Sequence, residues 1–66
     1  MDRGIRLNAR QKNLGLKDQE VQRDSGLSID TIRKLGKVSM SAELLDSLEQ
    51  GIEAARLAKI SVLQAG

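Results

Sequence analysis

The chain contains no aromatic residue, cysteine, histidine or proline, and this absence limits what its 66 residues can fold into. Disulfide bonds are excluded, as are metal sites and catalytic centres built on cysteine or histidine. A hydrophobic core has to come from ten Leu, five Ile, three Val, two Met and six Ala. Because Leu and Ala favour helices and dominate this set, we expect a single all-α domain over residues 1–66.

The core of such a chain is small. A domain of about 60 residues buries only about 60% of the surface that its unfolded form exposes, so a partner chain would add stability. No apolar run approaches the roughly 20 residues that span a bilayer, and the N-terminal sequence MDRGIRLNAR is too charged for a signal peptide. We therefore expect a cytoplasmic protein.

Charge is divided unevenly along the chain. Residues 1–37 carry nine Lys or Arg against five Asp or Glu, whereas residues 38–66 carry two against four. The N-terminal half therefore suits a polyanion, although a charged stretch is more often a solvated face. The carboxylates of the other half recur along one side of an expected helix, which is typical of a solubilising face: Glu43, Asp46, Glu49 and Glu53. We expect no enzymatic activity, cofactor or metal.

Glycines and capping residues predict where the helices end. A first helix over about residues 2–14 ends at Gly15, and helices over about 18–24 and 29–35 are joined by a turn. In that turn Gly26 permits a positive φ, and Ser28 can cap the helix that follows it.

The C-terminal half predicts one or two further helices. Gly36 ends the third helix, and residues from about Ser39 or Ser41 onward are predicted to be helical again. Gly51 either separates helices over about 41–50 and 52–64 or is tolerated inside one long helix. The chain is thus expected to form four or five short helices.

The stretch LGLKDQEVQRDSGLSIDTIRKLGK, residues 14–37, consists of a short helix, a glycine turn and a second short helix. Its apolar spacing is that of a helix-turn-helix, with the inward positions Val21, Leu27, Ile32 and Leu35. From Ile5 to Lys37, a little over half of the chain, the sequence resembles the lambda-type phage repressor and Cro family of Xre-like regulators. The resemblance implies a core over about 5–50 whose second motif helix lies in the major groove of DNA.

The resemblance also implies which side chains face DNA. Ile29, Asp30 and Lys34 fall at base-reading positions, where they suit a thymine methyl, cytosine N4 and guanine O6 and N7. The expected backbone contacts are Arg6, Arg10, Lys17, Gln19, Ser28, Thr31, Arg33 and Lys37. The alternatives are a solvated face for the first-helix arginines, a favourable helix-dipole position for Asp30, and a structural cap for Ser28.

The sequence departs from the family pattern at two positions. Asp18 stands where the family usually has glutamine, so that either Gln19 takes its place or the register differs by one. Gln22 stands where a small residue is usual, and it has to reach solvent along the seam or hold the two helices slightly apart.

The apolar residues of the expected C-terminal helix predict a homodimer. Residues 7–48 supply a core of their own, so the residues left for an interface are Ile52, Ala55, Ile60, Val62 and Leu63. The alternative is an ordinary helix folded back on the core of its own chain. Two-fold pairing would match a palindromic operator.

The expected function is a homodimeric, sequence-specific repressor of a phage, plasmid or other mobile element, located at the nucleoid of a bacterium or in phage infection. Two alternatives remain. The first is a protein-interaction module, such as a DNA-binding antitoxin or an anti-activator. The second is an excisionase-like protein, because GLSIDTIRKLGK also resembles MerR and excisionase helices. Those proteins continue into a β-wing, whereas residues 41–48 predict a helix.

Overall fold

The computed structural model describes residues 2–65, with side chains described for residues 2–61. Four helices occupy this range, and it contains no β-strand. They are α1 (Arg3–Asn13), α2 (Asp18–Ser25), α3 (Ile29–Arg33) and α4 (Ala42–Ala65). The all-α prediction is confirmed, with four helices of which the last is long.

The ends of the first three helices follow the local signals of the sequence. The Asp2 side chain accepts a 2.8 Å hydrogen bond from the Gly4 N–H and so caps α1. The turns after α1 and α2 use Gly15 at φ 69° and Gly26 at φ 75°, which a residue with a Cβ rarely adopts. The Ser28 hydroxyl accepts from the Thr31 N–H at 3.3 Å, confirming its capping role in α3.

α3 is shorter than expected. It ends at Arg33, because the Lys34 and Leu35 N–H groups bond to carbonyls only three residues earlier and tighten the last turn. Leu35 nevertheless stays in the core at 1% exposure, and Gly36 follows with a φ of 82°.

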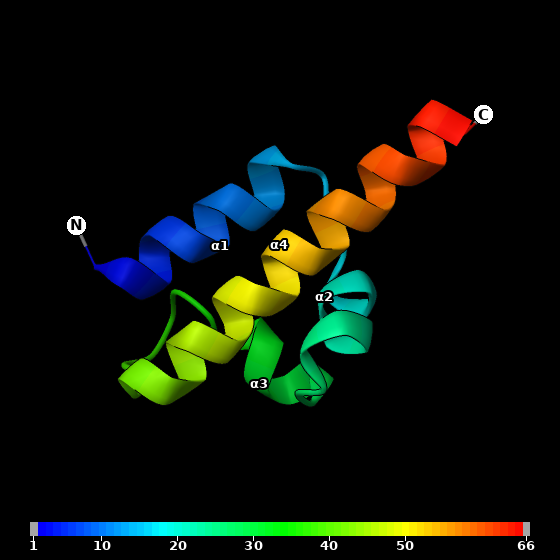
Figure 1. Ribbon diagram of the computed structural model, residues 1–66. Coiled ribbons are helices and arrows are strands. Elements are labelled where there is room, and N and C mark those ends of the chain that lie inside the picture. The colour runs from blue at the N-terminus through cyan, green and yellow to red at the C-terminus, as the bar shows by residue number, and fades with distance from the viewer. Residues whose placement is uncertain (1, 66) are drawn as a thin grey trace.

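α4 is one continuous helix. It lies across the other three and packs most extensively on α2 (Figure 1). A Cβ atom added to Gly51 would lie 2.6 Å from the Cβ of Ser25. Gly51 therefore does not break α4; it lets α2 and α4 approach more closely than any side chain would allow.

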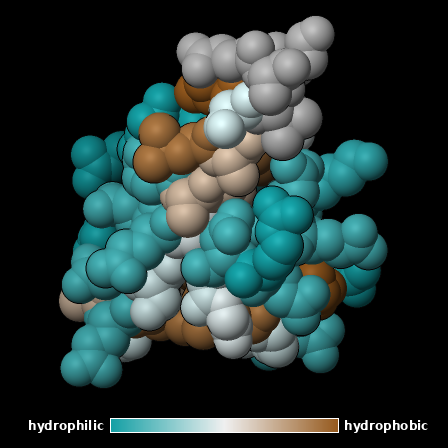
Figure 2. All heavy atoms as spheres, turned by 45° about the vertical axis from the view of Figure 1, so that its right-hand side comes forward, coloured by the Kyte–Doolittle hydropathy of each residue, from teal (hydrophilic) through white to brown (hydrophobic). Residues whose placement is uncertain are grey.

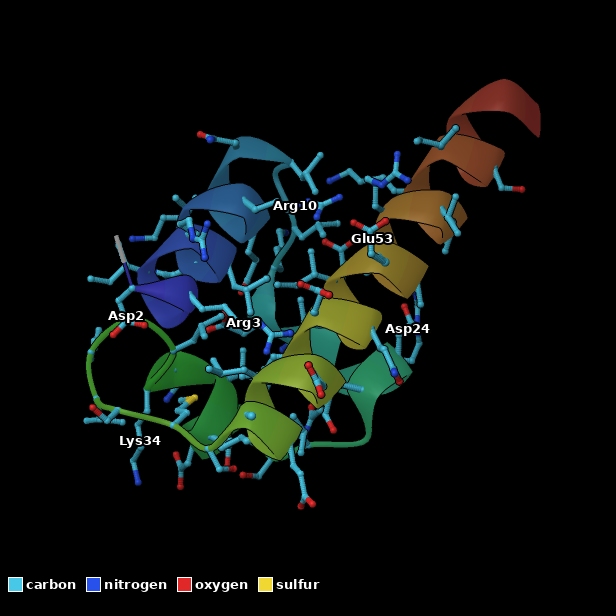
Figure 3. The ribbon with its side chains drawn as sticks, turned by 60° about the vertical axis from the view of Figure 1, so that its left-hand side comes forward. Asp2, Arg3, Arg10, Asp24, Lys34 and Glu53 are labelled. Atoms are coloured by element: carbon cyan, nitrogen blue, oxygen red, sulfur yellow. The ribbon has the colours of Figure 1, made fainter. Side chains whose placement is uncertain are left out.

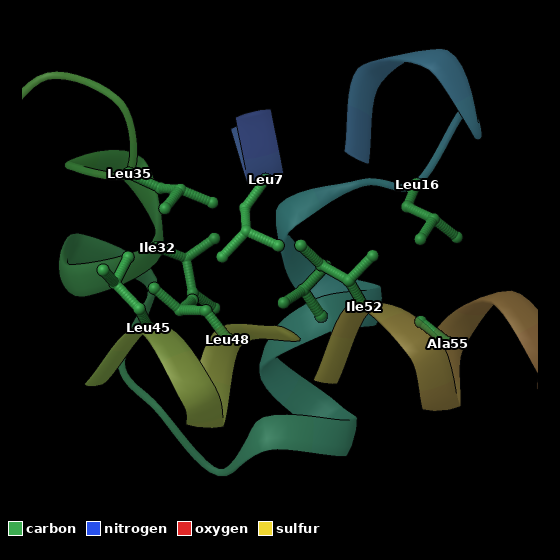
Figure 4. Close-up of a cluster of buried hydrophobic side chains, with 9 residues drawn as sticks. Leu7, Leu16, Ile32, Leu35, Leu45, Leu48, Ile52 and Ala55 are labelled. Atoms are coloured by element: carbon green, nitrogen blue, oxygen red, sulfur yellow. The ribbon is translucent and has the colours of Figure 1, made fainter. Parts of the chain in front are cut away.

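The core joins residues from all four helices and from the α1–α2 connection (Figure 4). It is purely aliphatic: Leu7, Leu16, Val21, Ile32, Leu35, Leu45, Leu48, Ile52 and Ala55 are at most 9% exposed. Leu14, Leu27, Met40 and Leu44 pack against it.

The dimer prediction was wrong for two of its residues. Ile52 and Ala55, at 0% and 1% exposure, lie in the core of their own chain. From the sequence, the core was expected to come from residues 7–48. Because α4 continues through Gly51, its next helical turn also packs on α2. The Val62 and Leu63 side chains lie outside the described residues.

Candidate nucleic-acid interface

α3 is held by its inner face and leaves its outer face in solvent. Ile32 and Leu35 anchor it in the core. Asp30, Arg33 and Lys34 lie on the exposed side of the same short segment. The structure therefore presents one small polar surface on α3, fixed by two buried side chains.

The three base-reading candidates differ in exposure. Asp30 and Lys34 are exposed, and Lys34 projects from the end of α3, away from the interface between α1 and α4 (Figure 3). Ile29 is half-buried. Within residues 2–61, Lys34 has no carboxylate partner within ion-pair distance, so its ammonium group is free to bind an external acceptor.

The backbone-contact candidates on α2 and α3 lie in accessible positions. The hydroxyls of Ser28 and Thr31 are 2.9 Å apart and bond to each other, while Arg33 and Lys37 are exposed beside them. At the start of α2, Lys17 and Gln19 are also exposed, and the Lys17 N–H donates to the Glu20 carboxylate at 3.1 Å.

The other two backbone candidates, on α1, lie on a different side of the molecule. Arg10 forms an ion pair with Glu53 of α4, and Glu53 also accepts from Arg56 at 3.2 Å (Figure 3). Arg6 is exposed in a depression that Arg10 and Glu49 also line. A carboxylate of its own chain therefore pairs with Arg10, and the assignment of Arg10 to the DNA backbone stays a prediction.

Arg3 belongs to the same α1–α4 interface. Its guanidinium lies 2.5 Å from an Asp46 oxygen and 3.6 Å from a Glu49 oxygen. The hydrogen bond to Asp46 raises the pKa of Arg3 above its usual value. Three of the four α4 carboxylates expected to form a solubilising face thus pair with arginines of α1: Asp46, Glu49 and Glu53.

Two residues on the opposite flank of α1 were not predicted from the sequence. Asn8 and Lys12, four residues apart on one helix face, line a depression together with Arg33 and Lys37. The signal was present in the sequence, since Asn8 and Lys12 lie on a different helical face from Arg3 and Arg10.

A buried glutamine joins the start of α2 to α1. Gln11, only 5% exposed, donates from its Nε2 to the Leu16 carbonyl at 3.3 Å and to the Asp18 carboxylate at 2.8 Å. Asp18 is therefore fixed in place, and its departure from the family pattern has a structural role here. Gln22 is half-buried, so its side chain reaches solvent along α2.

The described C-terminal part of α4 carries exposed apolar side chains. Leu57 is 58% and Ile60 38% exposed, and Figure 2 shows apolar side chains gathered toward this end above a largely hydrophilic body. Leu14, Leu16 and Ile60 line a shallow apolar depression there. Beside it, the Lys59 ammonium donates to the Gly15 carbonyl at 2.8 Å.

Comparison of the chain with protein-family models, curated proteins and solved structures found no match. Among the described helices, none combines the length and the apolar character needed to cross a membrane.

Proposed function

We propose that this protein binds double-stranded DNA through α2 and α3, acting as a helix-turn-helix of the lambda-repressor type, and that it regulates transcription. One observation carries the proposal. The cations on and beside α3 (Arg33, Lys34 and Lys37) have no carboxylate partner within residues 2–61, whereas Arg3 and Arg10 are paired with α4. Of the exposed cations without such a partner, three lie within residues 33–37, on and beside α3, while Arg6, Lys12 and Lys17 lie on α1 and at the start of α2.

The proposed contacts follow from the chemistry of that face. With α3 in the major groove, Lys34 donates to guanine O6 or N7 and Asp30 accepts from cytosine N4. Ile29, being half-buried, offers only part of its side chain to a thymine methyl. Arg33 and Lys37 bind phosphates and fix the position of α3 on the duplex.

A homodimer remains part of the proposal, with a smaller interface than the sequence predicted. Leu57 and Ile60 are the large apolar side chains exposed on the described part of α4, and both lie beyond the buried Ala55. Pairing two copies there would bury this apolar surface and present two α3 helices to a palindromic site.

The test of DNA recognition is selection from a random duplex library, followed by affinity measurements on the selected site. The expected result is a short preferred sequence, and Lys34→Ala should relax the preference at one base pair by about 1–3 kcal/mol. The matched control is Lys59→Ala, because Lys59 lies on α4 near Gly15. Failure of the wild-type chain to bind any duplex at low salt would contradict the proposal.

The dimer is tested by sedimentation of the full chain and of a Leu57→Asp, Ile60→Asp variant. Because both residues are exposed, the variant should keep its helical circular dichroism while the dimer dissociates to a monomer. Its affinity for a single half-site should be unchanged. A wild-type chain that stays monomeric on a palindromic duplex, or that assembles only with a different protein, would favour the interaction-module alternative.

A further inference from the structure

A small depression separates α1 from α3 and has a volume of about 140 Å³. Its lining combines three cationic side chains with a single carboxylate: Asn8, Lys12, Asp18, Ile32, Arg33 and Lys37. The cations come from α1, from α3 and from the turn after α3, segments that are distant in sequence. The fold therefore assembles a local concentration of positive charge that no single helix carries.

These three cations are not neutralised by an ion pair within residues 2–61. Asp18 is the only carboxylate lining the depression, and one of its oxygens accepts the 2.8 Å hydrogen bond from buried Gln11. The carboxylate is thereby tied to α1 and cannot swing away without losing that bond. It contributes a fixed negative charge beside Lys12, Arg33 and Lys37.

We propose that this depression holds one backbone phosphate of duplex DNA, bound by Lys12, Arg33 and Lys37, and that Asp18 weakens its binding. This inference rests on the proposed DNA-binding function and adds Lys12 as a contact and Asp18 as a residue that limits affinity. A phosphate attracts the three cations and is repelled by a carboxylate in the same depression, so removing that one charge strengthens binding.

The effect of Asp18 on affinity differs in sign from its effect on folding. A carboxylate in the first turn of a helix is favourable for the helix dipole, so Asp18 supports α2. Asp18→Asn keeps an oxygen that accepts from Gln11 but removes the charge. A purely structural role predicts unchanged or weaker DNA binding in this variant, whereas the proposal predicts tighter binding together with equal or slightly lower thermal stability.

The experiment measures fluorescence anisotropy of a mixed-sequence duplex of about two helical turns between about 50 and 200 mM salt. The full-length chain is compared with Asp18→Asn and Lys12→Gln. The controls are Glu43→Gln, which removes a first-turn carboxylate from α4, and Lys59→Gln, which removes a lysine that does not line the depression. Circular dichroism and thermal melting establish that each variant is folded.

Asp18→Asn should raise affinity about threefold or more, in line with the loss of one nearby like charge. Lys12→Gln should lower affinity and reduce the log–log salt slope by about 0.9, the value for one phosphate. Both controls should stay within about twofold of the wild type, since neither side chain lines the depression.

Three results would overturn the inference while leaving DNA binding intact. The first is an Asp18→Asn variant that binds the duplex no more tightly than the wild type. The second is a Glu43→Gln variant whose affinity rises as much as that of Asp18→Asn. The third is a Lys12→Gln variant whose salt slope is unchanged. Inorganic phosphate that displaces the duplex better than chloride at equal ionic strength would indicate a free-anion site instead. If the wild-type chain itself does not bind the duplex, the proposed function fails together with this inference. Failure of the inference alone is recognised by a wild-type chain that still binds.

Discussion

The two flanks of α1 carry similar cations but face different neighbours. On one flank Arg3 and Arg10 meet Asp46, Glu49 and Glu53 of α4. On the other flank Lys12 lies beside cations of the α3 segment, and Asp18 is the only carboxylate lining the depression there. The difference lies in the carboxylates: α4 supplies three of them to the first flank, whereas Asp18 alone lines the depression on the second.

The largest expected effect comes from removing the cations of the α3 side. Arg33→Ala combined with Lys37→Ala should reduce duplex affinity more than about tenfold and lower the salt slope by about 0.9, because two of the three cations that hold one phosphate are lost. Anisotropy titrations at several salt concentrations measure both quantities.

The paired flank provides the control for that experiment. Arg3→Ala combined with Arg10→Ala removes the same amount of charge, but from side chains already neutralised by α4, and affinity should stay within about twofold of the wild type. If the two double variants lost the same amount of duplex affinity, the two flanks of α1 would not differ in DNA binding.

The placement of α4, which brings its carboxylates to α1, depends on Gly51. Gly51→Ala should lower the free energy of unfolding by about 1–3 kcal/mol, because the added Cβ meets Ser25 at 2.6 Å and overpacks the α2–α4 contact. Urea denaturation followed by circular dichroism measures the change.

Gly4→Ala is the matched substitution in α1. The nearest atom to its new Cβ is an Asp2 oxygen at 3.5 Å, which is ordinary contact, so this variant should be as stable as the wild type or up to about 0.5–1 kcal/mol more stable. A Gly51→Ala variant that is equally stabilised would mean that α2 and α4 can separate at no cost.

The smallest expected effect is that of Arg10→Ala alone. Its pair with Glu53 is partly exposed, with 46% and 33% of the two side chains accessible, so its loss should cost less than about 1 kcal/mol of stability. DNA affinity should not change measurably. A uniform loss of affinity for all duplexes would instead identify Arg10 as a phosphate contact.

The sequence was most informative where structure is determined locally. Gly15, Gly26 and Ser28 mark helix ends through backbone conformation and capping, which depend on neighbouring residues only, and all three predictions were confirmed. The inward positions of α2 and α3 followed from helical spacing in the same way: Val21, Ile32 and Leu35 are buried.

The features that the sequence did not predict depend on contacts between distant segments. The continuity of α4 at Gly51 is explained by the approach of Ser25, and the burial of Ile52 and Ala55 follows from the same approach. Arg10 pairs with the carboxylate of Glu53, which lies 43 positions later in the sequence. Helical spacing places residues on a face, but it does not identify the element that the face meets.

The most direct test of the account is an NMR titration of the isotopically labelled chain with duplex DNA. The account predicts that amide shifts concentrate in residues 28–37 and at Lys12, while the α1–α4 interface around Arg3, Arg10 and Glu53 changes little. Shifts centred on that interface, or no shifts at all at low salt, would contradict the central claim that the unpaired cations around α3 form the DNA-binding surface.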